Sequence, residues 1–218
     1  IYYDPKRFLD MAGGNSSICN EEGLLIAYSN GQVIVDGHNV TIADTINYDY
    51  NVQRNCNEWE VNNLGNNQLA IPIGLTFWQR VLFLPINENL YCLYNSYDYC
   101  KGSGSKLLYS AMKYDKNNHT SFLKEKDEII LNDTLTTSLY AIRHGNGVDW
   151  WVITLNLDLT EILVFLADSN GIYLKNKQQV RAQNNFTKGI GQIASSPDGK
   201  YLAWYNGFVT GVNGGGFS

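Results

Sequence analysis

The sequence predicts an all-β domain, and three observations lead to this class. Apolar residues make up 44% of the 218 residues, and 15 Tyr and 5 Trp contribute to an aromatic share of 13%. A chain of this composition can bury a core, and its Tyr-, Val- and Ile-rich runs favour strands. Turn residues separate these runs, with 20 Gly but only 4 Pro. Because all-β domains of this size are often single units, we expect one domain over residues 1–218.

Strand and turn signals cover most of the chain. A short amphipathic stretch at 4–12 is the one helix candidate, and 44–67 is expected to be a long polar loop. Asn30-Gly31, a strong hairpin signal, connects the first two expected strands. The expected strands are 22–28, 32–36, 40–42, 69–73, 77–84, 90–94, 107–112, 128–131, 138–143, 149–155, 161–167, 172–174, 191–195 and 201–204.

Three similar turn phrases favour a β-propeller over a sandwich or barrel. They are Ser29-Asn30-Gly31, Ser169-Asn170-Gly171 and Ser196-Pro197-Asp198-Gly199. In the last phrase Pro presets the first turn position, Asp binds local backbone amides and Gly takes a positive φ. At about 40–45 residues per blade, the chain length predicts roughly five blades or part of a larger propeller.

The charge pattern excludes several classes of protein. The formal net charge is −5 and no basic patch is present, so we expect no nucleic-acid partner. The mixed-sign run at 124–128 is expected to be a solvated turn or strand end. No stretch of about 18 apolar residues occurs, so we expect no membrane insertion. The first residue is Ile1, which fits a processed product whose targeting segment has been removed.

The four cysteines predict an oxidising location. Cys92 and Cys100 flank a Tyr- and Asn-rich segment that can fold as a hairpin, so a disulfide between them is reasonable, with a second between Cys19 and Cys56. An even cysteine count in a polar, Asn-rich chain favours an extracellular setting. Four buried free thiols are the alternative, because free Cys is commonly buried.

The sequence carries no motif for catalysis, for a cofactor or for a metal. It has no phosphate-binding loop, no nucleophile elbow, no dinucleotide fingerprint and no paired-cysteine zinc motif. His38, His119 and His144 are the only histidines and none has a partner at ligand spacing; His144 is expected to brace the turn at Gly145. We therefore expect a protein that is not an enzyme.

Aromatic side chains are the binding candidates. Trp150 and Trp151 are adjacent in an expected strand and so face opposite sides; one is expected in the core, and the other could stack on a sugar or peptide. Packing of both in the core is the alternative. The other candidates are Trp59 in the long loop, and Tyr97 and Tyr99 in a Tyr-rich segment.

Five phrases in the same order resemble a known group of proteins. They are Glu21–Gly31 with Val33–Asn39, Leu69–Pro72, Leu90–Tyr94, Leu107–Asp115 and Leu139–Thr154, followed by the Ser196–Lys200 turn. In this order they are similar to propeller blades of large surface proteins from gliding bacteria that use type IX secretion. The resemblance spans roughly residues 20 to 205.

The resemblance implies a secreted, surface-anchored propeller with WD40-like repeats and no catalytic residues. The sequence departs from that group at Leu155, where the group has His, and it lacks the group's Met-Pro-Asn-Gly phrase after His38. The chain also stops after the Ser196–Lys200 blade, where the group continues with further strands, so a propeller truncated at its C-terminal end is one expectation.

Several residues are candidates for glycosylation. Asn-x-Ser/Thr sequons are surface-loop acceptors in secreted proteins of eukaryotes. The resemblance to the gliding bacteria implies O-glycosylation at Thr45 and Thr134 instead, because Asp44-Thr45-Ile46 and Asp133-Thr134-Leu135 resemble the short signal of those bacteria. The sequons begin at Asn15, Asn39, Asn118, Asn132 and Asn185.

These observations predict a non-catalytic binding or adhesion module at the cell surface. Its expected partners are a glycan or a protein on a surface, and other modules of the same polypeptide or filament. A propeller-type hydrolase or lyase acting on glycans is the alternative. An intracellular WD-repeat scaffold is disfavoured by the cysteines and by the missing Trp-Asp repeats.

Overall fold

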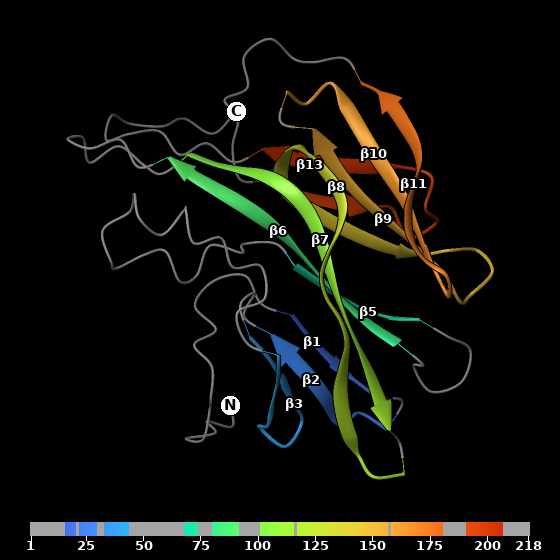
Figure 1. Cartoon of the computed structure of the whole chain (residues 1–218). Coiled ribbons are helices and arrows are strands. Elements are labelled where there is room, and N and C mark those ends of the chain that lie inside the picture. The colour runs from blue at the N-terminus through green and yellow to red at the C-terminus, as the bar shows by residue number, and fades with distance from the viewer. Residues whose placement is uncertain are drawn as a thin grey trace, which may run out of the picture.

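The computed structural model is all-β, as predicted (Figure 1). Its described residues contain thirteen strands in three antiparallel sheets, and none of these residues lies in a helix. The expected helix at 4–12 and the whole of the expected loop at 44–67 lie outside the described part of the chain. The described residues are 16–20, 22–29, 33–43, 68–73, 80–91, 101–115, 117–156, 158–180 and 191–206.

The first sheet is a four-stranded meander, and two of its turns are held by hydrogen bonds to Asn and Asp side chains. The Asn20 side-chain oxygen accepts hydrogen bonds from the backbone amides of Glu22 and Leu24, and a carboxylate oxygen of Asp36 accepts those of His38 and Val40. Such side chains replace backbone partners in tight turns and so set where each strand ends. The strands are β1 (Ser16–Cys19), β2 (Leu25–Ser29), β3 (Ile34–Asp36) and β4 (Thr41–Ala43).

The second sheet has seven strands, each paired with its neighbours in the chain. They are β5 (Gln68–Ile73), β6 (Arg80–Tyr91), β7 (Lys101–Asp115), β8 (Thr120–Arg143), β9 (Trp150–Asn156), β10 (Glu161–Asp168) and β11 (Gly171–Gln179). The third sheet is the hairpin of β12 (Gly191–Ser195) and β13 (Leu202–Asn206).

Strand β8 belongs to two ladders. Its first part pairs with β7, and its last part pairs with β9. Leu135 is the changeover, because it is opposite both Gly104 in β7 and Asn156 in β9. The seven-stranded sheet therefore consists of two four-stranded meanders, β5–β8 and β8–β11, that share one strand.

Two sequence predictions about strand breaks are wrong. The expected strands 77–84 and 90–94 are not separate, because β6 runs from Arg80 to Tyr91. The charged run at 124–128, expected at a turn or strand end, lies within β8. The backbone there bulges: Asp127 has a φ of 52° and its amide donates to the Ser110 hydroxyl, at 3.1 Å. A bulge keeps a strand paired across residues that look like a turn in the sequence.

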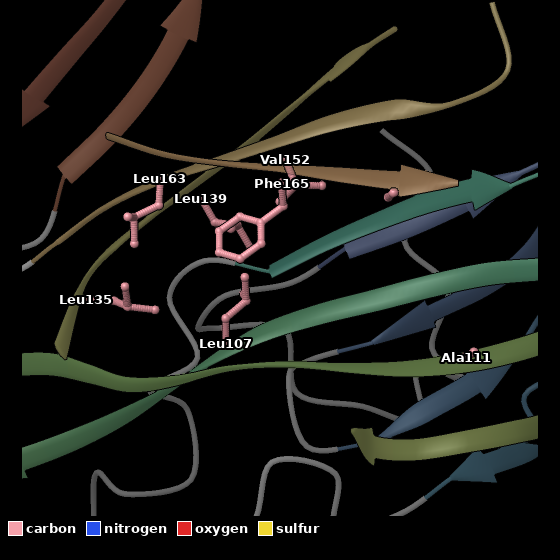
Figure 2. Packing of buried hydrophobic residues seen from close by; sticks show 8 residues of the cluster. Leu107, Ala111, Leu135, Leu139, Val152, Leu163 and Phe165 are labelled. Atoms are coloured by element: carbon pink, nitrogen blue, oxygen red, sulfur yellow. The ribbon is translucent and has the colours of Figure 1, made fainter. Parts of the chain in front are cut away.

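Three clusters of buried side chains hold the sheets together. The central cluster lies on one face of the seven-stranded sheet, with the Phe165 ring near Leu107 and Leu139 (Figure 2). A second cluster joins the first sheet to Met112 of β7, and a third joins Ile193 of β12 to the other face of β9 and β10. The central cluster is Leu107, Ala111, Leu135, Leu139, Val152, Leu163, Phe165 and Ala167.

The middle parts of β9 and β10 are thus buried on both faces. On β9 Val152 belongs to the central cluster, whereas Ile153 and Leu155 belong to the third. Adjacent strand residues point to opposite faces, so a run of apolar residues is needed where both faces are covered. The strands that the structure describes do not close into a barrel or a complete ring.

Candidate functional site

Three connections meet at one end of the β8–β11 meander. Alternate connections of an antiparallel meander lie at the same end, so loop 144–149 after β8 and turn 169–170 after β10 are neighbours (Figure 1). The turn between β12 and β13 joins them, because a Cβ atom placed on Gly199 would lie 3.7 Å from Cδ1 of Ile142 in β8. We call this region the loop end.

The two adjacent tryptophans lie at the loop end on opposite faces of the sheet. Trp150 packs against the central cluster, and the Arg143 guanidinium lies 5.0 Å from its ring centroid. Trp151 points to the other face, where its ring centroid is 5.0 Å from that of His144, with the ring planes at 51°. Both tryptophans are half-buried. Trp150 therefore packs with the central cluster, and Trp151 packs against His144 on the opposite face.

Trp151 is part of a row of side chains across the sheet. Ile142 of β8 is opposite Trp151 on one side. On the other side Trp151 is opposite Leu166 of β10, which is opposite Tyr173 of β11. Residues opposite one another in an antiparallel sheet share a face, so the side chains of Trp151, Leu166 and Tyr173 lie side by side. Each of the three is half-buried. We call them the aromatic row; its outer members are two strand spacings apart, roughly 10 Å.

Loop 144–149 is held by hydrogen bonds within itself. The Asn146 side-chain oxygen accepts from the amides of Val148 and Asp149, at 3.0 and 3.1 Å, and its Nδ2 donates to the Asp149 carboxylate at 2.6 Å. The His144 amide donates to the Asp149 carbonyl oxygen, at 2.8 Å. The expected bracing role of His144 agrees with this geometry.

The same loop fixes the tautomer of His144. The backbone amide of Asn146 donates to Nδ1 of His144 at 3.1 Å. An imidazole nitrogen that accepts a hydrogen bond carries no proton, so the neutral ring carries its proton on Nε2. His144 thus offers a hydrogen-bond donor beside the Trp151 ring.

Asp168 and Tyr173 form a bonded pair at the other end of the row. The Tyr173 hydroxyl donates to Oδ2 of Asp168, and the Asn170 amide donates to Oδ1 at 2.7 Å. Burial alone would raise the pKa of Asp168, but these hydrogen bonds and one from the Gly171 amide hold that pKa below its ordinary value. The bond to Asp168, with burial and the charge of nearby carboxylates, raises the pKa of Tyr173.

The charged side chains at the loop end have partners within the protein. Asp149 accepts from Asn146, and Asp168 accepts from Tyr173. Asp198 accepts from Ser196 at 2.6 Å and lies 3.3 Å from the Lys200 ammonium. The Lys175 ammonium lies 4.6 Å from the centroid of the Tyr173 ring.

Of the five binding candidates predicted from sequence, two can be located. Trp150 and Trp151 are at the loop end, whereas Trp59, Tyr97 and Tyr99 lie outside the described residues. Sequence reasoning missed Leu166, Asp168 and Tyr173. The signal that could have found them is the period-two pattern of β10 and β11 together with the pairing of these strands around the turn at Asp168-Ser169-Asn170-Gly171.

The predicted disulfides stay predictions. Cys56, Cys92 and Cys100 lie outside the described residues, and Cys19 is an exposed free thiol at the end of β1. The glycosylation candidates Asn15, Asn185 and Thr45 are also outside, as is the side chain of Thr134 in β8.

Three sequon asparagines are exposed in the structure. Asn39 has a φ of 67° and its side-chain oxygen accepts from the Tyr28 hydroxyl at 2.7 Å. Nδ2 of Asn118 donates to the Asp115 carboxylate at 2.8 Å. Asn132 lies within β8.

The three histidines lie on different turns. His38 follows β3, His119 precedes β8 and bonds the Tyr114 hydroxyl at 2.9 Å, and His144 follows β8. Among the described residues, no group of three or more His, Cys, Asp or Glu side chains is placed to hold a metal ion. That part of the chain also has no helix long and apolar enough to cross a membrane.

Comparison with known proteins gives no match. No protein-family model matches the chain, and neither a curated protein nor a solved structure matches it at a significant level. The resemblance to type IX-secreted surface proteins therefore rests on the sequence phrases alone.

Proposed function

We propose that this chain is a non-catalytic binding or adhesion module at the cell surface, which contacts a glycan or a protein through the aromatic row. The observation that carries this proposal is the row itself: Trp151 and Tyr173 flank Leu166 on one face of the sheet. Half-buried aromatic rings with hydrogen-bonding neighbours are characteristic of recognition surfaces. The hydrogen bonds within loop 144–149 hold Trp151 and His144 in place before any ligand arrives.

A propeller is the architecture that we propose for the module. Four units follow one another along the chain: β1–β4, β5–β8, β8–β11 and the hairpin β12–β13. The first strands of successive units touch, since β1 contacts β5, β5 contacts β8 and β8 contacts β12. Propeller blades are four-stranded antiparallel sheets arranged around a central channel, which is consistent with these contacts.

The proposed setting is extracellular. The even number of cysteines and the ordered phrases shared with type IX-secreted surface proteins support it. In this setting the chain is one module of a larger secreted polypeptide, and its neighbours in that polypeptide or filament are further partners. The exposed sequons Asn39, Asn118 and Asn132 are accessible to a glycosylating enzyme.

A glycan array and an attachment assay on host or polymer surfaces test the proposed function. Wild-type protein is compared with Trp151→Ala and Tyr173→Ala. Phe122→Ala is the matched control, because Phe122 is 42% exposed on β8 and lies outside the loop end. The two row variants should remain folded, as circular dichroism can verify, but lose attachment, whereas the control should keep it.

Two results would overturn the proposal. The first is equal attachment by all four proteins. The second is turnover of a polysaccharide that is abolished by replacing one Asp or Glu, which would make the chain a glycan hydrolase or lyase.

A further inference from the structure

Two carboxylates beside the aromatic row keep their negative charge, because their hydrogen-bond donors are neutral groups. Ionised Asp168 is bonded by Tyr173 and by backbone amides, and Asp149 is bonded by Asn146. The nearby Asp198 lies against Lys200. These two negative charges would repel an anionic ligand. A ligand without charge meets no such repulsion.

The dimensions of the row suit a chain of rings. Trp151 and Tyr173 are separated by one strand, and the leucine between them is apolar. Two platforms roughly 10 Å apart can each take the apolar face of one ring of a linear ligand, while a single ring can cover only one of them. Loss of either platform should then weaken the longer ligand more than a single ring.

Hydrogen-bonding groups border both platforms. The donor on Nε2 of His144 lies beside Trp151, because Nδ1 is occupied by the Asn146 amide. The Asp168 carboxylate lies beside Tyr173 as an acceptor. A donor at one end and an acceptor at the other match hydroxyl groups, which both donate and accept.

We infer that the ligand of the aromatic row is a neutral oligosaccharide of at least two sugar units, laid across β9, β10 and β11. One sugar ring stacks on Trp151 and another on Tyr173. This inference rests on the proposed binding function, and it commits the row to an uncharged glycan rather than a uronate- or sulfate-bearing one.

Replacing Lys175 tests the inference, because a neutral ligand and an anionic ligand predict different changes in affinity. Its ammonium lies 4.6 Å from the Tyr173 ring centroid, in the space that a stacked sugar would use. Lys175→Ala should therefore leave the affinity for a neutral oligosaccharide unchanged or raise it. An anionic glycan would bind that ammonium, so the same variant would weaken its binding.

The experiment is calorimetric titration with neutral mono- to tetrasaccharides of glucose, mannose, galactose and N-acetylglucosamine, and with oligogalacturonates and sulfated oligosaccharides as charged counterparts. For the best neutral series we expect affinity to rise about tenfold or more from one sugar to three and then level off. It should change little between about 0.1 and about 1 M salt, because no charge pair forms. Trp151→Ala should remove most of the gain with length.

The outcomes separate the inference from the proposed function. Tighter binding of charged glycans with loss on Lys175→Ala, or equal affinity for one sugar and three, would overturn the inference while leaving a glycan-binding module. No binding of any glycan, charged or neutral, would overturn the inference as well; attachment to a protein-coated surface that depends on Trp151 would then leave the proposed binding function standing.

Discussion

Gly37 lies against the backbone of Leu25, so closely that a Cβ atom at position 37 would be 2.0 Å from the Leu25 carbonyl oxygen. The Gly37 amide also donates to the carbonyl oxygen of Ile26, at 2.8 Å. The end of β3 therefore has room for glycine alone, and the turn that leads to β4 depends on it.

Gly37→Ala should destabilise the protein by about 2 kcal/mol or more, because the new methyl group meets backbone that cannot move aside without breaking the sheet. Urea unfolding measures the change. The matched control is Gly145→Ala, where a Cβ meets nothing within 4 Å. If the two variants unfold at the same urea concentration, position 37 has room for a Cβ atom and the prediction is wrong.

Gly199 should also be intolerant, for a conformational reason. Its φ is 69°, in the left-handed region that β-branched residues resist. Gly199→Val should lower the melting temperature, whereas Gly199→Asn should lower it less because Asn tolerates this region. The surface chemistry of the domain should be unaffected. Equal melting temperatures for wild type and the Val variant would contradict the turn geometry.

Asp168 should make the domain sensitive to acid. Hydrogen bonds hold its pKa below the ordinary 3.8 in the folded protein. A depressed folded pKa contributes stability above the unfolded pKa, and that contribution is lost as the pH falls through the folded pKa. The difference in unfolding free energy between wild type and Asp168→Asn should therefore shrink as the pH falls below about 4. A difference that stays constant from neutral to acid pH would rule out this role.

The cysteines give a prediction about the compartment. We expect Cys92 to be joined to Cys100 in protein isolated without reducing agent. Peptide mapping by mass spectrometry under non-reducing conditions identifies the pair. Four alkylatable thiols in such a preparation would instead indicate a reducing compartment.

The strands predicted best are those whose alternating pattern is bounded by turn residues on both sides. The expected 149–155 and 161–167 agree with β9 and β10 to within one residue at each end. Loop 144–149 and the turn after Asp168 carry Gly and Asn signals that set those bounds. Local sequence was sufficient to predict these strand ends, because side chains within each turn accept hydrogen bonds from the backbone of the same turn.

Strand β8 and the aromatic row could not be predicted in the same way. The charged run before Ile129 looks like a turn, but Glu125 and Glu128 within it pair with β7. Tyr173 is brought level with Trp151 by the pairing of three strands, and the register of β10 with β11 shifts at a bulge between Val164 and Phe165. A register of this kind depends on contacts between strands, which a single sequence does not state.

The affinity of Trp151→Ala for the glycan or surface that the wild-type domain binds decides whether the aromatic row is the binding site. We predict a loss of roughly tenfold or more in affinity in a variant that remains folded, because Trp151 lies beside His144 and outside the central cluster. Phe122→Ala should bind as tightly as wild type. Wild-type affinity in Trp151→Ala would contradict the claim that the aromatic row is the binding site.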